Sequence, residues 1–373
     1  MESCDALIVG GGPAGSSCAQ TLRQAGLDVL VLDKAGFPRP KVCAGWITPG
    51  VFRDLGFEPD QYGAGRVLQP MTGFRVGTIG GVGVVSRYGE IVSYGVLRTE
   101  FDHYLLERSG ARLRLGEPLT GLERSGGHWV VNGSIRTPLV VAAGGHFCPV
   151  ARLLGMAGAG EVVATQEAEV EMDEPLGARC RVEAEMPELY FCRDLKGYGW
   201  CLRKGSHLNV GLGRAGDREV RRHTEAFVSW LRQTGRIPEE LPLPLKGHAY
   251  RLWAGGVGEV VGDGVLRIGD AAGLAHPRSG EGIRPAVESG LLAAETIVDA
   301  AGDYRKEKLT AYVRRLADRL GGARRRGVQD LIPERWKRSA AAKLLASSWF
   351  SRRIVLDGWF LRPREPVSGL AKS

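Results

Sequence analysis

The stretch ALIVGGGPAGSSCAQTLRQAGLDVLVLD, residues 6–33, decides the fold. Its four apolar residues 6–9 predict a buried strand, and the glycine-rich turn at residues 10–15 leads into a helix from Ser16 to about Gln24. Gly26 ends that helix, and a second apolar strand follows and closes on an acid. This order is typical of the nucleotide-binding half of a Rossmann-like fold, with a parallel sheet and covering helices.

The glycines of this G-x-G-x-x-G pattern have separate physical roles. The first makes a tight turn, the second lets the backbone approach a pyrophosphate, and the third lets the helix pack closely on the strand. The N-terminus of the helix offers unpaired N–H groups to phosphates, and the acid can accept hydrogen bonds from ribose hydroxyls. The segment therefore predicts an adenine dinucleotide site. Its predicted contacts are Gly10, Gly12, Pro13, Ala14, Gly15, Asp33 and Lys34.

A second stretch, GDAAGLAHPRSGEGI at residues 269–283, follows another apolar strand and precedes a helix expected from Pro285 to about Ala300. Its glycines would bring bare backbone N–H groups against a planar ring, where a side chain would clash. Here the chain resembles FAD-dependent oxidoreductases of the p-hydroxybenzoate hydroxylase type, and most closely their geranylgeranyl reductase branch. The resemblance implies that FAD is the cofactor. It places flavin contacts at Gly269, Asp270, Gly280, Gly282 and Ile283.

Three further segments are similar to that branch. PRPKVCAG at residues 38–45 resembles its P-x-K-x-C-G segment, which implies cofactor contacts at Lys41 and Ala44. LRTEFD at residues 97–102 resembles its R-x-x-F-D helix, whose arginine, here Arg98, reaches the phosphate region of the cofactor. Residues 190–211 are similar to the substrate-domain hairpin, and the W-x-W-x-I-P arrangement of flavin halogenases is missing around Trp200.

One segment departs from the related hydroxylases. They carry an A-D-G sequence after a strand and use it in handling both FAD and NADPH, whereas this chain has Gly144 at the aspartate position. We therefore expect slow or no direct reduction of the flavin by NADPH. The sequence does not decide whether the electron donor is NADPH, a ferredoxin or a flavodoxin.

Two side chains are candidates for catalysis. The resemblance places Cys43 beside the flavin, where a thiol could donate a proton to a substrate carbon; a small buried filler is the alternative. His276 lies inside the flavin loop and could pass protons, with a structural hydrogen bond as the alternative. Glu167 and Glu169, two apart on an expected strand, would share one face and are interpreted as structural.

Composition narrows the class of protein. The seven cysteines are odd in number and scattered without a C-x-x-C pair, which argues against a disulfide framework or a metal site and fits a reducing cytoplasm. No apolar run approaches the roughly 18–20 residues that span a bilayer. No sequence pattern typical of nucleic-acid binding supports such a partner.

The charge is concentrated near the C-terminus. Residues 319–365 hold 12 basic and 4 acidic residues, so they account for the whole formal net charge of +8. Aromatic residues interleave with these charges, which suits a helix on an anionic membrane surface with Trp349 and Trp359 at headgroup depth. The alternative is a helical subdomain that packs its aromatic side chains on the main body.

Together these patterns predict an α/β protein in which the FAD-binding domain is joined by an antiparallel β-sheet substrate domain and a C-terminal helical segment. The expected boundaries are residues 1–70, 96–160 and 255–305 for the FAD-binding domain, 71–95 and 161–254 for the substrate domain, and 306–373 for the basic segment. The expected activity is reduction of carbon–carbon double bonds in an isoprenoid or other apolar substrate. A flavin monooxygenase and a flavin-binding electron carrier without its own substrate are the alternatives.

Overall fold

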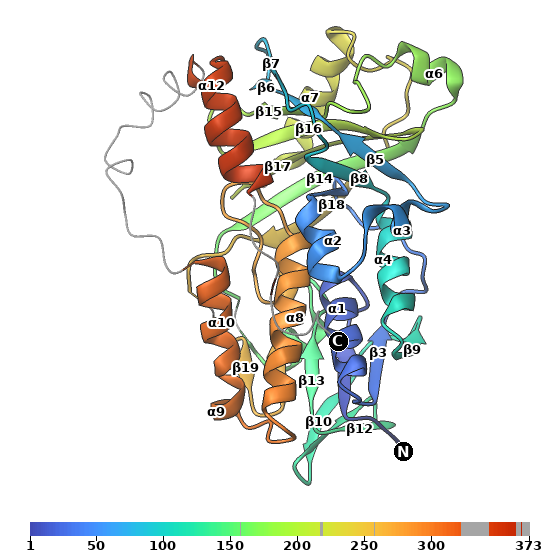
Figure 1. Cartoon of the computed structure of the whole chain (residues 1–373), viewed down its shortest axis with the longest axis vertical. Helices are drawn as coiled ribbons and strands as arrows, with labels where there is room; N and C mark the ends of the chain where they lie inside the picture. The colour runs from blue at the N-terminus through green and yellow to red at the C-terminus, as the bar shows by residue number, and fades with distance from the viewer. Residues whose placement is uncertain (157, 217–218, 257, 322–342, 363–366, 368–373) are drawn as a thin grey trace.

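The computed structural model describes residues 1–156, 158–216, 219–256, 258–321, 343–362 and 367. Two sheets stand one above the other in Figure 1: a parallel sheet with its helices below, and a longer, mainly antiparallel sheet above. The predicted fold class is confirmed. The seven cysteines are all free thiols. No helix among the described residues has both the length and the apolar character that crossing a membrane requires.

The lower, six-stranded sheet is built around the opening stretch of the sequence. Its order is β19 (Val261–Gly262), β20 (Val265–Arg267), β13 (Val140–Ala142), β2 (Ala6–Val9), β3 (Val29–Asp33) and β9 (Arg112–Leu115). All neighbours pair in parallel except β19 and β20. Residues buried on both faces, nearly all of them apolar, form the central strands β13, β2 and β3, as expected for a parallel sheet covered on both faces, whereas the edge strand β9 is partly exposed.

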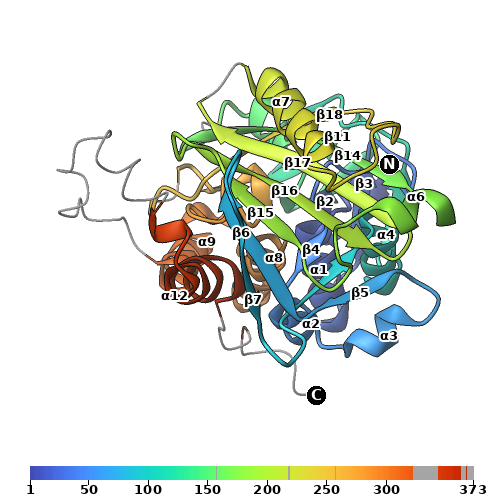
Figure 2. The same cartoon turned by 90° about the horizontal axis from the view of Figure 1, so that it is seen from above.

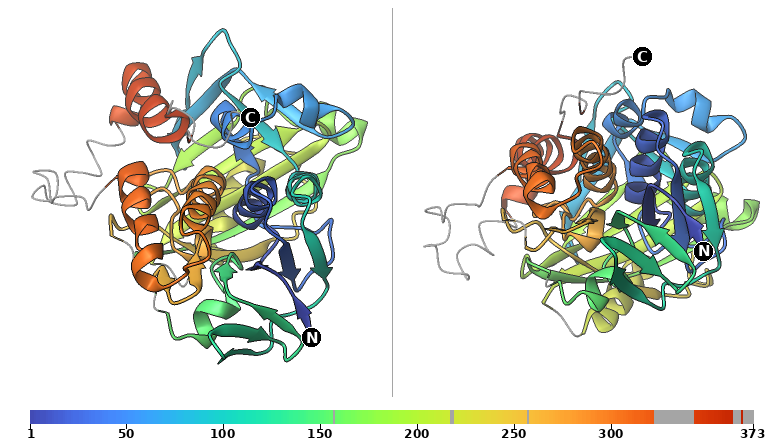
Figure 3. Two further views of the ribbon diagram at one scale, coloured as in Figure 1. Left: turned by 60° about the horizontal axis from the view of Figure 1, so that its bottom comes forward. Right: turned by 90° about the horizontal axis from the view of Figure 1, so that it is seen from below.

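Helices cover one face of this sheet and a smaller sheet covers the other. The helices are α1 (Pro13–Gln24), α4 (Arg98–Arg108) and α8 (Ile283–Asp299), with α9 (Lys306–Leu309) and α10 (Ala311–Leu320) outside α8 (Figure 1). The smaller sheet has the order β1 (Glu2–Ser3), β12 (Ile135–Thr137), β11 (His128–Val131) and β10 (Leu122–Ser125), and it lies near the N-terminus in Figure 3. Short helix α5 (Pro149–Leu153) follows β13.

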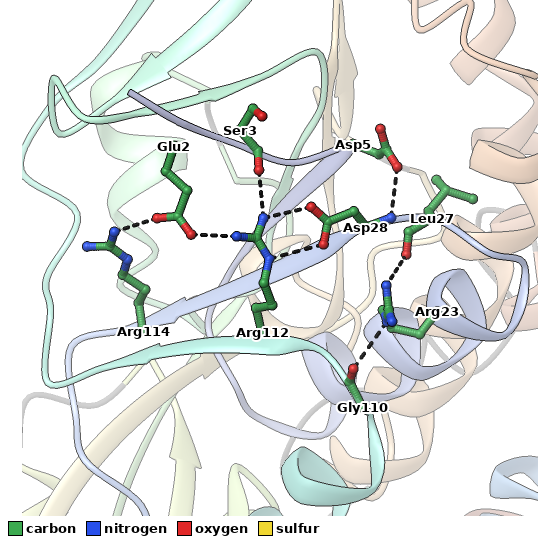
Figure 4. A network of polar contacts seen from close by, with 9 residues as sticks. All are labelled: Glu2, Ser3, Asp5, Arg23, Leu27, Asp28, Gly110, Arg112 and Arg114. Carbon is green, nitrogen blue, oxygen red and sulfur yellow. Dashed lines mark hydrogen bonds and ion pairs between the residues drawn. The ribbon is translucent and has the colours of Figure 1, made fainter.

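Exposed charges tie the strands together where they begin (Figure 4). The guanidinium of Arg112 donates to both carboxylate oxygens of Asp28 at 3.0 and 2.7 Å and to Glu2 at 2.6 Å. Glu2 also pairs with Arg114, and the backbone N–H of Asp28 donates to Asp5 at 2.8 Å. The amino ends of β1, β3 and β9 are therefore held by polar groups that satisfy one another.

The upper, seven-stranded sheet is almost wholly antiparallel. Its order is β18 (Lys246–Arg251), β14 (Val162–Glu171), β17 (His207–Ala215), β16 (Gly197–Lys204), β15 (Glu188–Phe191), β6 (Gly73–Thr78) and β7 (Val84–Arg87). The pair β15 and β6 is parallel, which the sequence-based prediction of an antiparallel sheet missed. Helix α7 (Val220–Gln233) lies over the outer face, where the Phe227 ring packs against Gly199 (Figure 2).

A third group of elements joins the two sheets. Strands β4 (Trp46–Ile47), β8 (Ser93–Val96) and β5 (Leu68–Met71) form a small antiparallel sheet beside helices α2 (Pro49–Leu55) and α3 (Pro59–Gly63). The loop between β3 and β4 carries the segment around Cys43. A 3₁₀ turn, η1 (Gly269–Ala271), follows β20.

One alternating run of the sequence does not form a strand. Residues 178–182 alternate between small or apolar side chains and arginine, a pattern that favours extended backbone, but helix α6 (Glu174–Arg179) includes the first part of that run. The helix begins because the Asp173 carboxylate accepts a hydrogen bond from the Leu176 N–H at 2.9 Å, and Pro175 occupies its first turn. These start signals outweigh a short alternation.

The described part of the basic C-terminal segment packs on the body. Helix α12 (Ser348–Phe350) continues into the π-helix η3 (Ser351–Leu361), beside β7 at the edge of the upper sheet (Figure 2). Val355, Leu356 and Phe360 are buried there, and Trp359 is half-buried against Phe191. Trp359 therefore packs in part on the body, while Trp349 is 67% exposed. The membrane contacts predicted for residues 322–342 and 363–366 fall on residues that the structure does not describe.

Candidate functional site

A cavity of about 840 Å³ lies between the two sheets. The carboxyl ends of the parallel strands open into it, as expected for ligand binding by an α/β sheet. Most of the residues predicted to contact the cofactor line it. These are Gly10, Gly12, Pro13, Ala14, Asp33, Lys34, Lys41, Ala44, Arg98, Asp270, Gly280, Gly282 and Ile283, together with Cys43.

The glycine turn shows why its members are not equivalent. Gly12 lines the cavity, and a side-chain Cβ there would meet no backbone; its nearest heavy atom would be the Arg39 Nη2 at an ordinary contact distance of 3.5 Å. A Cβ on Gly15 would instead meet the carbonyl oxygen of Gly10 at 1.9 Å. Gly15 does not line the cavity, and neither does Gly269, whose Cβ would lie 2.9 Å from that of Ala14. Gly12 thus leaves room for a ligand, while the other two allow close packing of the chain.

Asp33 shapes the turn as well as facing the cavity. Its carboxylate accepts hydrogen bonds from the backbone N–H of Gly11 at 2.8 Å and of Ala35 at 2.9 Å. Each oxygen keeps a further lone pair for a ribose hydroxyl. The acid at the end of β3 therefore couples the glycine turn to the predicted ribose position.

Charged groups face the cavity at low solvent exposure. The Arg98 guanidinium is buried and binds Asp102 in a bidentate pair at 2.7 and 2.8 Å, and Arg39 lies 3.4 Å from the same carboxylate. Burial and the charge of Arg98 lower the pKa of Lys41. Burial raises the pKa of Asp270, against the opposing effects of Lys41 and Arg98. The cationic groups suit a phosphate-bearing ligand.

Several buried polar atoms of the described residues that line the cavity have no hydrogen-bond partner in the protein. They are Trp46 Nε1, Thr48 Oγ1, His146 Nδ1, Thr165 Oγ1 and His248 Nε2. Burial, with the charges of Lys41, His146 and Arg98, lowers the pKa of His248 to about 3, so its ring is neutral at physiological pH. Buried polar groups are normally paired, and a bound ligand with polar edges would supply partners here. The glycine turn, the cations and these atoms fit FAD.

His276 lies elsewhere. The residue is absent from the lining of the cavity and borders a smaller pocket behind the flavin loop. Its Nδ1 is 2.9 Å from the hydroxyl oxygen of Ser279. The structure therefore does not bring His276 to the place where the sequence-based hypothesis put a proton donor, and it favours the alternative of a structural hydrogen bond within the loop.

The loop that carries Cys43 rests on a buried polar cluster of the upper sheet. The Asn209 side-chain amide donates to the carbonyl of Cys43 at 3.3 Å, and Lys204 Nζ donates to the carbonyl of Ala44 at 3.0 Å. Lys204 also pairs with Glu169, and Asn209 donates to Glu167 and Glu169 at 3.1 and 3.0 Å. The two glutamates thus share a face of β14, as expected, and burial raises the pKa of Glu167.

The remaining wall of the cavity is largely aromatic and apolar. It is formed by Trp46, Leu189, Tyr198, Trp200, Tyr250 and Phe360. The Tyr198 hydroxyl donates to the carbonyl of Ser279, which connects the upper sheet to the flavin loop. The sequence-based prediction missed Phe360, which comes from the C-terminal segment, and also His146 and His248. The alternation of residues 246–251 places His248 and Tyr250 on one face of β18 and was an available signal.

Among the residues that the structure describes, no group of three or more histidine, cysteine, aspartate or glutamate side chains is arranged to hold a metal ion.

Known proteins are similar to this chain in sequence and in fold. The family described as FAD binding domain matches residues 3–319. Menaquinone reductase of Mycobacterium tuberculosis is 31% identical over 330 residues, covering 79% of this chain and 77% of its own. Digeranylgeranylglycerophospholipid reductase of Methanocaldococcus jannaschii is 29% identical over 330 residues, covering 83% and 81%.

Solved structures show a shared fold at lower identity. A geranylgeranyl bacteriochlorophyll reductase-like protein from Thermoplasma acidophilum superposes with a TM-score of 0.74 at 20% identity, covering 99% of this chain and 94% of the other. A point mutant of the halogenase PltM in complex with FAD has a TM-score of 0.67 at 16% identity, covering 85% of this chain and 74% of the other. The family match over most of the chain confirms FAD as the cofactor. The chain therefore belongs to the FAD binding domain family and is an FAD-dependent oxidoreductase, with relatives named as reductases of a geranylgeranyl lipid and of menaquinone.

Proposed function

We propose that the protein reduces carbon–carbon double bonds of an isoprenoid or similarly apolar substrate. One observation carries the proposal: a single cavity joins the flavin cradle to an aromatic wall, and Cys43 lines that cavity on a loop next to both. An alkene held against the aromatic wall would lie within the same enclosure as the reacting part of the cofactor. The relatives named as reductases of a geranylgeranyl lipid and of menaquinone support this class of substrate.

When bound and reduced, FAD supplies a hydride equivalent. Reduction of an alkene also needs a proton at the second carbon, and the Cys43 thiol is the candidate donor. The thiolate left behind would recover its proton from solvent, so the double bond gains one hydride and one proton in each turnover. General acid catalysis of this kind contributes on the order of 10²–10⁴-fold.

The surrounding residues prepare this thiol for its role. Lys204 and Asn209 hold the backbone carbonyls of residues 43 and 44, and the Gly45 N–H donates to the Cys43 sulfur at 3.4 Å. The charge of Arg98 also lies close to the same sulfur. These contacts fix the loop against the upper sheet. The apolar wall keeps bulk water away from the alkene.

The direct test is anaerobic turnover of the chemically reduced holoenzyme with a polyprenyl alcohol or lipid. We expect products heavier by two mass units for each double bond reduced, together with reoxidation of the flavin. Reoxidation that requires O₂ and yields a hydroxylated or epoxidised product would instead establish the monooxygenase alternative. A flavin that exchanges electrons with a partner protein while no apolar substrate changes would establish the electron-carrier alternative.

The donor of electrons is proposed from one position in the cavity wall. Gly144 lines the cavity after β13, where related hydroxylases have an aspartate. We expect a ferredoxin, a flavodoxin or a chemical reductant to reduce the flavin faster than NADPH does. Anaerobic stopped-flow absorbance with each donor measures this, and rapid bleaching by physiological NADPH would contradict it.

A further inference from the structure

We propose that Phe360 is a specificity-determining residue that closes the apolar end of the cavity and limits the length of the substrate chain. This inference rests on the proposed function for the class of substrate. It adds that the C-terminal segment, which the sequence marks only as basic, forms part of the substrate site.

The position of the Phe360 ring is the first observation. The side chain is 4% exposed and lines the cavity from the end of η3. Its ring stacks on Trp46 with centroids 5.2 Å apart and an interplanar angle of 15°, and it meets Tyr198 edge-on at 5.5 Å. Trp46 follows the Cys43 loop and Tyr198 lies on the upper sheet. Phe360 thus joins the two walls between which an apolar chain would lie.

The backbone on both sides of Phe360 is anchored. Before it, the Tyr88 hydroxyl donates to the Asp357 carboxylate at 2.7 Å, which fixes η3 to the end of β7. After it, the Arg284 guanidinium donates to the carbonyl of Arg362 at 3.3 Å. Arg284 is held in turn by Asp54 at 3.2 Å and by Glu288 at 3.1 Å, all three side chains being buried.

These anchors make the ring a fixed wall. Arg284 directly follows Ile283, which lines the flavin side, so the cluster that holds the chain after Phe360 also begins the flavin-binding helix α8. Movement of the Phe360 backbone away from Trp46 would break the hydrogen bonds that Tyr88 and Arg284 make to Asp357 and to the carbonyl of Arg362, and polar groups left without partners are costly. A substrate chain longer than the space in front of the ring therefore has to end there or remain outside.

The test uses saturated primary alcohols from eight to eighteen carbons as probes of the oxidised holoenzyme. They contain no double bond, so binding is measured independently of reductase activity, through the flavin absorbance and tryptophan fluorescence. Each methylene that enters an apolar site should tighten the Kd about fourfold. With the natural protein we expect the gain in affinity per methylene to stop at a definite length of the alcohol.

Phe360→Ala should move that limit to longer chains, so that an alcohol two carbons beyond the original limit binds about fifteenfold tighter than to the natural protein. Phe360→Trp should move it to shorter chains. Phe350→Ala is the matched control, because Phe350 packs on the same segment and does not line the cavity.

Limits that are unchanged in both Phe360 variants would overturn the proposal. A steady gain of affinity along the whole alcohol series in the natural protein would overturn it as well. So would an equal shift of the length limit in the Phe350 variant, or the failure of any alcohol to bind. Activity with polyprenyl substrates is measured separately. A shifted limit without alkene reduction would leave Phe360 in this role and reject the reductase, whereas reduction with an unshifted limit would do the reverse.

Discussion

The two edges of the six-stranded sheet treat polar groups in opposite ways. At the amino edge, Arg112, Glu2 and Asp28 are 42%, 26% and 43% exposed and are bonded to one another (Figure 4). At the carboxyl edge, Lys41 and Asp270 face a cavity whose lining includes histidine, threonine and tryptophan atoms that lack hydrogen-bond partners within the protein. The polar groups at the amino edge satisfy one another without a ligand. The carboxyl edge keeps polar atoms whose hydrogen bonds a ligand would have to supply.

The energetics of the two edges also differ. Exposed ion pairs contribute about 0–1 kcal/mol each, because water screens their charges and the side chains lose entropy. A buried charge that loses its partner costs about 3–5 kcal/mol. Changes at the amino edge should therefore alter stability slightly and binding not at all. Changes at the carboxyl edge should alter cofactor binding, turnover or folding strongly.

The largest expected effect is at the glycine turn. Gly12→Val should give a folded protein without FAD, because the added side chain would occupy the part of the cavity beside Gly12 that the pyrophosphate needs. The absorbance ratio of the flavin and protein bands in the purified protein measures the cofactor content, and circular dichroism measures the fold.

Two other glycines serve as controls. Gly36→Val should stay yellow, since a Cβ at that position has no heavy atom within 4 Å. Gly15→Ala should fail to fold rather than only lose FAD, because its Cβ would overlap the Gly10 carbonyl. If the Gly12→Val protein were still yellow, and so still bound FAD, the pyrophosphate would not bind at this turn.

The next effect concerns the proposed proton donor. Cys43→Ser should leave the FAD content and flavin reduction intact and slow turnover by about 10²–10⁴-fold, since the hydroxyl is a weaker acid. Single-turnover oxidation of the reduced flavin by substrate measures the step. Cys180→Ser, within the core of the upper sheet, should leave the rate unchanged. Equal rates for the natural protein and the Cys43 variant would assign Cys43 to packing.

A third, intermediate effect compares a buried cation with an exposed one. Lys204→Met should lower the free energy of unfolding by about 3–5 kcal/mol, because Glu167 and Glu169 would lose the buried cation between the sheets. Arg112→Met at the amino edge should lower it by about 1 kcal/mol or less. Urea denaturation of both variants measures the difference, and equal losses would remove the contrast between the two edges.

The smallest effect concerns the proposed contact of the C-terminal segment with an anionic membrane. Arg352 and Arg353 are exposed on η3, and each basic residue near such a surface contributes roughly 1 kcal/mol. Arg352→Gln with Arg353→Gln should weaken salt-sensitive co-sedimentation with anionic liposomes without loss of FAD. Arg112→Gln should have no effect, because Arg112 begins β9, at the end of the molecule away from the C-terminal segment (Figure 1). Failure of the natural protein to sediment with anionic liposomes at low salt would leave the segment structural.

Most of the predicted contact residues that line the cavity come from segments that are local in sequence. Residues 6–33 and 269–283 contain the turns that form the flavin side, because glycine positions and apolar runs restrict the backbone within a few residues. At His276, which lies in one of these stretches, the sequence left open whether the side chain passes protons or makes a structural hydrogen bond. Its ring follows the bend of the loop toward Ser279, and the direction of a side chain in an irregular loop has no periodic signal.

The sequence by itself determined that the chain binds FAD and how its strands and helices alternate, since turns and apolar periodicity act over short distances. Tertiary structure decided the other wall: Lys204 and Asn209 reach the Cys43 loop across some 160 residues, and Phe360 closes the cavity from the far end of the chain. It also decided the pKa of His248, which is lowered by burial and by cations from other segments. The physical reason is that burial and long-range contact depend on how the sheets dock, and docking depends on all surfaces at once.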